Sequence, residues 1–287
     1  MRTGVIILPQ QGHAGTARLW RRAEEYGFTH AWTYDHLAWR SLADEPWQAT
    51  VPVLTVAALA TSTIRIGTLV SSPNFRHPVP FAKELMSLDE VSEGRFTLGF
   101  GAGAPGHDQS VLGDEVPAPA ERTARFREFV DLLDRLLTRP VTSFGGAYYR
   151  AVEARMIPGC VQKPRLPFVL AANGPVAVRH AARFAARHGD GWVTTGNWRP
   201  TDDHADWWRA VRETVDRFDA AGGPAGNRHL IIDPLGRFPV LASAQAFADA
   251  AGKAAELGFT DVVVHWPRAS GVYAGDEAVL ETLDLRA

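Results

Sequence analysis

The sequence predicts a single α/β domain over residues 1–287, folded as a closed (β/α)8 TIM barrel with an inserted hairpin. Short β-branched runs alternate with longer runs of helical spacing, a pattern typical of a parallel sheet with helical crossovers. Eight such units in one chain of this length favour a closed barrel over an open doubly wound sheet. The turn after the first strand-like run, "PQQGHAG", lacks the G-x-G-x-x-G fingerprint of a Rossmann fold.

The first four strand–helix units account for the N-terminal half of the chain. Their strands are expected at residues 4–8, 29–35, 64–70 and 95–101. The helices that follow them are expected at residues 16–27, 51–62, 79–92 and 121–138. The last of these helices is the most regular, because its apolar side chains form one stripe: Phe126, Phe129, Val130, Leu133, Leu136 and Leu137.

The alternation pauses between residues 139 and 165. There, Gly145 and Gly146 separate two strand-like runs, which predicts an inserted hairpin. The alternation then resumes, with strands expected at residues 167–172, 191–196, 228–235 and 260–266. The matching helices are expected at residues 175–189, 204–222, 244–258 and 273–285.

Composition excludes several classes of function. The formal net charge is −2, from 30 basic and 32 acidic side chains, so no basic surface is expected to hold a nucleic acid. The one cysteine, Cys160, cannot form an intrachain disulfide, which fits a reducing cytoplasm. No apolar stretch reaches the length needed to cross a bilayer, so no membrane partner is expected. The histidines lack the spacing of metal motifs, and no metal is expected.

In barrels of this kind, chemistry occurs in the loops that follow the carboxyl ends of the strands. Polar and glycine residues follow most of the expected strands, as a ligand pocket requires. Asp35 and His36 stand side by side after the second strand, and Gly101–Gly103 form a side-chain-poor turn after the fourth. His265, at the end of the eighth strand, is either a proton-handling residue or a histidine bonded to a neighbouring loop.

The turn "AANGPVAV" follows the fifth barrel strand. Pro175 takes the first helical position, where its missing N–H costs nothing. The backbone N–H groups of Val176 and Ala177 then face outward and form an anion site of the kind found at helix N-termini. The motif by itself fits either a phosphate-binding turn or a well-capped helix, and favours the second.

Five blocks spread over nearly the whole chain resemble the luciferase-like monooxygenase family. They are "TYDHL", "IRIGTLVSSPNFRHP", "SLDEVSEGRFTLGFGAG", "AANGPVAVRHAARFAARHGDGW" and "ELGFTDVVV". The family has a (β/α)8 fold and uses FMN or the deazaflavin coenzyme F420. "TYDHL" matches the F420-dependent branch better than the FMN branch.

The resemblance implies roles for individual residues. Asp35 and His36 approach the deazaflavin ring, with His36 as the proton-handling or ring-contacting residue. The bond Leu69–Val70 is a non-prolyl cis peptide behind the ring, and Ser72 lies at the polar edge of the ring. The expected catalytic residues are His36, Asp35 and His265. The expected cofactor-binding residues are Asp35, His36, Leu69, Val70, Ser72, Gly101, Ala102, Gly103, Ala172, Asn173, Gly174, Pro175, Val176 and Ala177.

The resemblance therefore implies an F420-dependent oxidoreductase that transfers a hydride between the deazaflavin and a small organic substrate. The alternative is a two-component monooxygenase of the same fold that uses reduced FMN and O2. A relative that binds no cofactor is the third reading, which the intact strand-end residues oppose. Ala104 stands where some F420-dependent sugar-phosphate dehydrogenases carry a glutamate. A cytoplasmic homodimer is expected, with a separate flavin or F420 reductase as a further partner.

Overall fold

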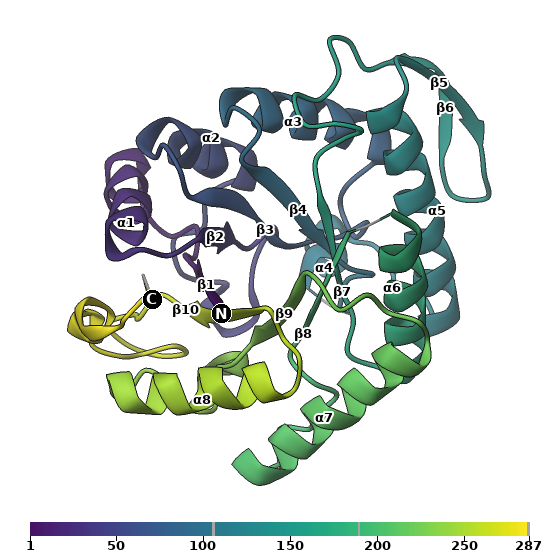
Figure 1. The fold of residues 1–287 in the computed structure, drawn as a ribbon. Helices are drawn as coiled ribbons and strands as arrows, with labels where there is room; N and C mark the ends of the chain where they lie inside the picture. The colour runs from purple at the N-terminus through teal and green to yellow at the C-terminus, as the bar shows by residue number, and fades with distance from the viewer. Residues whose placement is uncertain (105–106, 189, 286–287) are drawn as a thin grey trace. The chain divides into compact units, whose positions relative to one another are not determined.

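The computed structural model describes residues 1–104, 107–188 and 190–285, and its elements are drawn in Figure 1. In this part of the chain the strand order β1-β10-β9-β8-β7-β4-β3-β2 is that of a closed barrel. In the described residues β1 pairs in parallel with β2 and β10, β9 with β8 and β10, β3 with β4, and β7 with β8. The (β/α)8 fold class is therefore confirmed. The barrel strands are β1 (Arg2–Ile6), β2 (His30–Thr33), β3 (Arg65–Ser71), β4 (Phe96–Phe100), β7 (Phe168–Ala171), β8 (Gly191–Thr194), β9 (Arg228–Ile231) and β10 (Asp261–His265).

Helices separate the strands as the periodicity predicts, and seven expected helices are confirmed to within three residues at each end. They are α1 (His13–Tyr26), α2 (Thr50–Ala60), α3 (Pro78–Val91), α5 (Pro119–Thr138), α6 (Pro175–His188), α7 (His204–Ala220) and α8 (Ala244–Glu256). The inserted hairpin is confirmed as the antiparallel pair β5 (Val141–Gly145) and β6 (Arg150–Arg155). Three short elements were not predicted: α4 (His107–Leu112) and the 3-10 turns η1 (Arg40–Leu42) and η2 (Pro234–Gly236).

The expected closing helix at 273–285 is wrong. Only a short 3-10 helix, η3 (Glu277–Thr282), forms there. Tyr273 has a left-handed φ of 63°, and Arg268 bonds through its backbone to both Tyr273 and Gly275. These bonds fold the segment into a loop before the helical spacing can begin, because an α-helix cannot start across a left-handed residue.

The chain forms two compact units. The first contains residues 1–7, 22–32 and 169–285, and the second contains residues 8–21 and 33–168. In the first unit Trp192 stacks on Phe218 with ring centroids 4.2 Å apart. In the second, the buried Phe100 packs edge-on against Phe168 at 5.0 Å. Aromatic pairs of this kind contribute large buried areas to a core. The expectation of one domain over residues 1–287 stays a prediction.

Among the described helices, none combines the length and the apolar character that crossing a bilayer requires.

Gly99 in β4 allows close contact between β4 and β3, just before the loops that follow these two strands. A Cβ at this position would lie 2.1 Å from the backbone oxygen of Thr68. The hydroxyl of Thr68 donates to the Gly99 carbonyl at 2.7 Å, and the strand register shifts between Thr68 and Ser71. Only a residue without a side chain fits against the backbone at this point.

Replacing Gly99 should therefore destabilise the fold. We expect Gly99→Ala to lower the free energy of unfolding by about 3 kcal/mol or more, because the obstacle is backbone and cannot rotate away. Gly252→Ala is the control: it lies in α8 with open space around its Cα, and should stabilise by up to about 1 kcal/mol. Denaturant unfolding of both variants checks this, and equal effects would contradict the packing argument.

Candidate functional site

His36 lies just beyond β2 in the second unit and is held by a carboxylate from α4. Its Nδ1 lies 2.8 Å from Oδ2 of Asp108, and the backbone N–H of Leu37 donates to Oδ1 of the same residue at 2.8 Å. The His36 side chain is 10% exposed and that of Asp108 is 2% exposed. Among the described residues Nε2 of His36 has no hydrogen-bond partner. One ring nitrogen is thus fixed and the other is open to a ligand.

Aromatic side chains surround this imidazole. The ring of Trp39 stacks on His36 with centroids 4.6 Å apart, and Tyr34 meets the His36 ring edge-on at 6.0 Å. The indole N–H of Trp47 donates to the backbone oxygen of His36 at 2.8 Å. The two tryptophans of this loop therefore contact the histidine within the unit. Trp39 restrains the plane of the imidazole by stacking, and Trp47 holds the backbone of the same residue.

Asp35 has different surroundings, although it is adjacent to His36. Arg76 binds both of its carboxylate oxygens, at 2.6 and 3.2 Å, and also binds Glu84 at 2.8 Å. Burial alone would lower the pKa of Arg76, but the Asp35 carboxylate raises it above its ordinary value. Asp35 is 1% exposed. A carboxylate whose two oxygens are engaged this way holds its loop in a fixed position.

The segments after β3 and β4 are joined by polar contacts. The Leu69–Val70 bond is cis, as the resemblance implies. Oγ of Ser72 accepts from the backbone N–H of Asn74 at 3.3 Å, and the Asn74 amide donates to the Ala104 carbonyl at 3.1 Å. Gly103 has a φ of 81°, and a Cβ there would meet the Asn74 side chain at 2.4 Å. The turn at 101–104 therefore packs directly on Asn74, with no side chain of its own between.

The expected anion site lies in the first unit, at the start of α6. Oδ1 of Asn173 accepts from the Thr194 hydroxyl at 2.7 Å and from the Thr195 backbone at 3.0 Å. These bonds fix the turn in front of α6. Pro175, Val176 and Ala177 are exposed, and no heavy atom lies within 4 Å of a Cβ built on Gly174. The helix N-terminus is therefore accessible, as an anion site needs.

His265 is enclosed by its own unit. Its Nδ1 lies 2.8 Å from Oδ1 of Asp233, and its backbone N–H donates to Oδ2 at 2.8 Å. Its ring stacks on Tyr273, with centroids 3.5 Å apart, and the residue is 3% exposed. Of the two readings that the sequence leaves open, this geometry favours the histidine bonded to a neighbouring loop.

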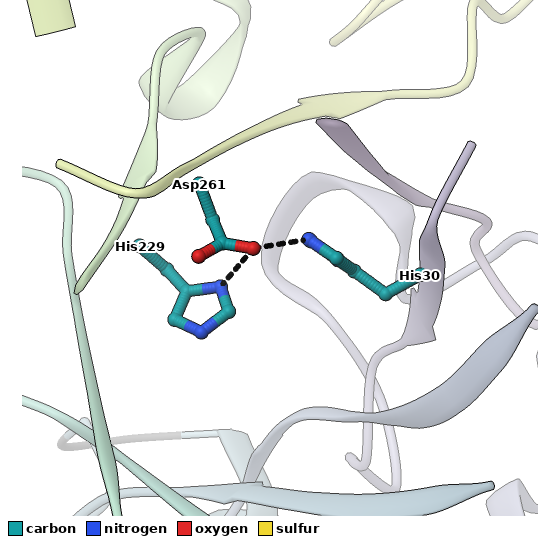
Figure 2. Close-up of side chains that lie close together, drawn as sticks. All are labelled: His30, His229 and Asp261. Carbon is teal, nitrogen blue, oxygen red and sulfur yellow. Dashed lines mark hydrogen bonds and ion pairs between the residues drawn. The ribbon is translucent and has the colours of Figure 1, made fainter. Parts of the chain in front are cut away.

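A second cluster, which the sequence did not indicate, combines His30, His229 and Asp261 in the first unit (Figure 2). Their ligand atoms lie within 4.8 Å of one another, a spacing that a metal ion could span. Nε2 of His30 lies 3.0 Å and Nδ1 of His229 lies 3.9 Å from Oδ1 of Asp261. The three residues are buried at the starts of β2, β9 and β10. A Cβ on Gly4 would lie 2.0 Å from the His30 ring, so the neighbouring strand leaves room for it.

Hydrogen bonding favours a proton-bearing cluster here over a metal site. The indole of Trp32, which can only donate, donates to Nδ1 of His30 at 2.6 Å. In neutral imidazole the other nitrogen, Nε2, then carries the proton and donates it to Asp261. A metal would need the lone pair at that position. Oδ2 of Asp261 is also engaged, by Arg2 at 2.8 Å and by Thr260 at 2.6 Å.

The charges in this cluster follow from burial. Burial lowers the pKa of His229 to about 3, so this histidine is neutral in the folded chain. Burial alone would raise the pKa of Asp261, but the hydrogen bonds from His30 and Arg2 lower it well below its usual range. His229 is therefore a neutral imidazole beside an ionised Asp261 carboxylate, which also binds Arg2.

The low pKa of His229 predicts acid sensitivity. Below pH 6.5 the unfolded chain protonates this residue and the folded chain does not, so stability is present above that pH and falls towards pH 3. The loss should reach about 1.4 kcal/mol per pH unit within this window. His229→Leu should remove that part of the slope in denaturant unfolding between pH 6.5 and 4.5. The exposed His13→Gln is the control, and an unchanged slope in His229→Leu would contradict the burial argument.

The bidentate pair predicts a large effect from removing one partner. Arg76→Met should lower the free energy of unfolding by about 3–5 kcal/mol, because it leaves the buried Asp35 carboxylate without its cation. Adding Asp35→Leu to this variant should recover part of the loss, since the orphaned charge is then gone. Chemical unfolding of the two variants tests this. A free energy of unfolding that is lower in the double variant than in Arg76→Met would show that Asp35 and Arg76 do not act as a pair.

The sequence therefore located His36 and the α6 turn but missed the partners of the strand-2 residues. Asp108 follows His36 by 72 positions and Arg76 follows Asp35 by 41. Arg76 follows the third strand in the sequence, where no local signal marks it as the partner of Asp35. No spacing rule connects residues this far apart in sequence.

Comparison with known proteins identifies relatives of this chain. An F420-dependent glucose-6-phosphate dehydrogenase of Amycolatopsis mediterranei is 37% identical over 178 residues, covering 61% of this chain and 51% of the relative. An F420-dependent hydroxymycolic acid dehydrogenase of Mycobacterium tuberculosis is 34% identical over 179 residues, covering 60% and 46%. The chain thus spans about half the length of these curated relatives.

Solved structures carry the same fold. The structure of an F420-dependent secondary alcohol dehydrogenase in complex with an F420-acetone adduct superimposes with a TM-score of 0.78. The match covers 100% of this chain and 99% of that chain at 16% identity, so it speaks to fold alone. The sequence model of the family described as luciferase-like monooxygenase matches residues 1–234. This chain belongs to the luciferase-like monooxygenase family.

Proposed function

We propose that this chain is an F420-dependent oxidoreductase that transfers a hydride between the deazaflavin and a small organic substrate bearing a hydroxyl or carbonyl group. The observation that carries the proposal is the His36 imidazole. It is mostly enclosed by aromatic rings, fixed at Nδ1 and open at Nε2. The curated relatives reported above are F420-dependent dehydrogenases, which supports the same cofactor class here.

The residues present fit this cofactor. In the second unit, the turn 101–104 has no bulky side chain, and His36 offers an open ring nitrogen beside flat aromatic neighbours. We assign Asp35, His36, Leu69, Val70, Ser72 and Gly101–Gly103 to the ring. In the first unit, the accessible start of α6 suits a phosphate, and we assign residues 172–177 to it. When bound, F420 accepts or returns a hydride at C5 of its deazaflavin ring.

The chain's own part in the reaction is to handle one proton and exclude water. As a substrate carbon releases its hydride, the hydroxyl proton passes to Nε2 of His36 and a carbonyl forms. The reverse reaction returns the same proton. Ala104 supplies no carboxylate, and His265 is enclosed and bonded to Asp233. The proton transfer is therefore assigned to His36, with Asp35 fixing the loop through Arg76.

The proposal also covers the compartment and the partners of the protein. We propose that the protein works in the cytoplasm as a homodimer, with a separate reductase regenerating its cofactor. The buried, unpaired thiol of Cys160 is compatible with a reducing compartment. Burial raises the pKa of this thiol, which makes it a poor nucleophile and leaves it outside the proposed chemistry.

Cofactor titration tests the proposed function. We expect F420 to bind more tightly than FMN when quenching of cofactor fluorescence is followed in the purified protein. His36→Ala should lower kcat by about 100-fold or more while changing F420 affinity far less, because the imidazole moves a proton rather than holding the cofactor.

Other outcomes of the titration are equally informative. Tight FMN binding with weak F420 binding would assign the chain to the flavin monooxygenases of the family, with O2 as co-substrate. Binding of neither cofactor would overturn the enzymatic proposal. His13→Gln serves as the matched control, since this exposed histidine is the first residue of α1 and belongs to no proposed site.

A further inference from the structure

We propose that Asp108 is a positioning residue that holds the proton of His36 on Nδ1 and thereby keeps Nε2 ready to accept a proton. The inference rests on the proposed function only for its catalytic consequence. The tautomer itself follows from the hydrogen bonds of this chain. Asp108 lies in α4, an element that the sequence did not predict, and in a position that the family resemblance does not assign.

The backbone N–H of Leu37 determines which oxygen of Asp108 faces His36. This N–H is an obligatory donor and occupies Oδ1 of Asp108 at 2.8 Å. Oδ2 is therefore left for Nδ1 of His36, also at 2.8 Å. Because an ionised carboxylate can only accept, Nδ1 must carry the proton. In the neutral ring Nε2 then has a free lone pair, which is the form a general base requires.

The surroundings make this arrangement rigid. Asp108 is 2% exposed, so solvent does not compete for its oxygens. Trp39 stacks on the imidazole, and Tyr34 meets its edge, which restrains a flip of the ring. Arg76 interacts with Asp108 through charge, but its hydrogen bonds go to Asp35 and Glu84. Asp108 is thus engaged by His36 and Leu37 and by no cation at hydrogen-bond distance among the described residues.

The substitution Asp108→Asn should reverse the tautomer of His36. Leu37 still needs an acceptor, so the side-chain oxygen of the asparagine turns to it. The amide NH2 then faces Nδ1 of His36, which must accept, and the proton moves to Nε2. The site keeps its shape, but Nε2 of His36 then carries a proton and cannot accept another. In a serine protease triad the equivalent exchange of aspartate for asparagine lowers kcat about 10⁴-fold through a wrong tautomer.

The first measurement needs no cofactor and no change at Asp108. The protein is labelled with ¹⁵N-histidine, and the ring nitrogens of His36 are assigned by loss of their signals in His36→Ala. We expect the protonated, pyrrole-type signal at Nδ1 and the pyridine-type signal at Nε2 at a pH where the ring is neutral. The opposite assignment in the unmodified protein would overturn the proposal, whether or not Asp108→Asn folds.

The second measurement compares Asp108→Asn, Asp108→Glu and the exposed control Asp114→Asn. Asp108→Asn should exchange the two nitrogen signals and lower kcat by about 10²–10⁴-fold, with KM and F420 affinity changed by less than about threefold. Asp108→Glu should keep the original tautomer and recover much of kcat. Asp114→Asn should change none of these. A tautomer exchange without loss of kcat would contradict the catalytic consequence.

The two proposals fail in different ways. If F420 does not bind and no turnover is found, the proposed function is lost while the tautomer result stands. If F420 binds and turns over but Asp108→Asn leaves the His36 signals unchanged, the proposed function stands and Asp108 has no positioning role.

Discussion

The ion pair between Arg76 and Asp35 is the constraint on which the candidate site depends. It joins the segment after β2 to the segment after β3 through two hydrogen bonds to one buried carboxylate. A bidentate guanidinium–carboxylate contact fixes direction as well as distance. It therefore fixes the backbone position of the next residue, His36. The contact with Asp108 then fixes the orientation of the His36 ring. Two adjacent titratable residues thus have different partners: Asp35 binds Arg76, and His36 binds Asp108.

A second buried carboxylate with several hydrogen bonds lies at the starts of the strands in the first unit. Asp261 collects bonds from Arg2, His30 and Thr260, all at the first residues of their strands or beside them. Chemistry in barrels of this fold lies at the carboxyl ends of the strands, and the amino ends serve stability. The Asp261 cluster fits the second role, because both carboxylate oxygens of Asp261 are bonded to neighbouring residues and the indole of Trp32 occupies the lone pair on Nδ1 of His30.

Membership of the luciferase-like monooxygenase family is compatible with both flavin and deazaflavin chemistry. Asp108, four residues after Ala104, is a buried carboxylate, and it pairs with His36. Under the proposed function, this pair handles the proton that a carboxylate at position 104 would otherwise handle. Trp39 and Tyr34 place flat aromatic rings beside the same imidazole.

The sequence by itself determined the order of strands and helices, because hydrophobic periodicity and turn residues are local signals that each segment carries in full. It also determined that His36 and the Asn173–Pro175 turn lie at strand ends, since position along a parallel strand follows from the same periodicity. It misjudged the C-terminal segment, where backbone bonds from Arg268 to Tyr273 and Gly275 outweigh a helical pattern.

Only the tertiary structure decided which partner each strand-end residue takes. Asp35 and His36 are neighbours in sequence, yet one binds Arg76 and the other Asp108. His30, His229 and Asp261 are far apart in the chain and meet because parallel strands align their first residues. Hydrogen bonds and ion pairs depend on distances of about 3 Å between atoms from separate elements, and no local pattern encodes those distances.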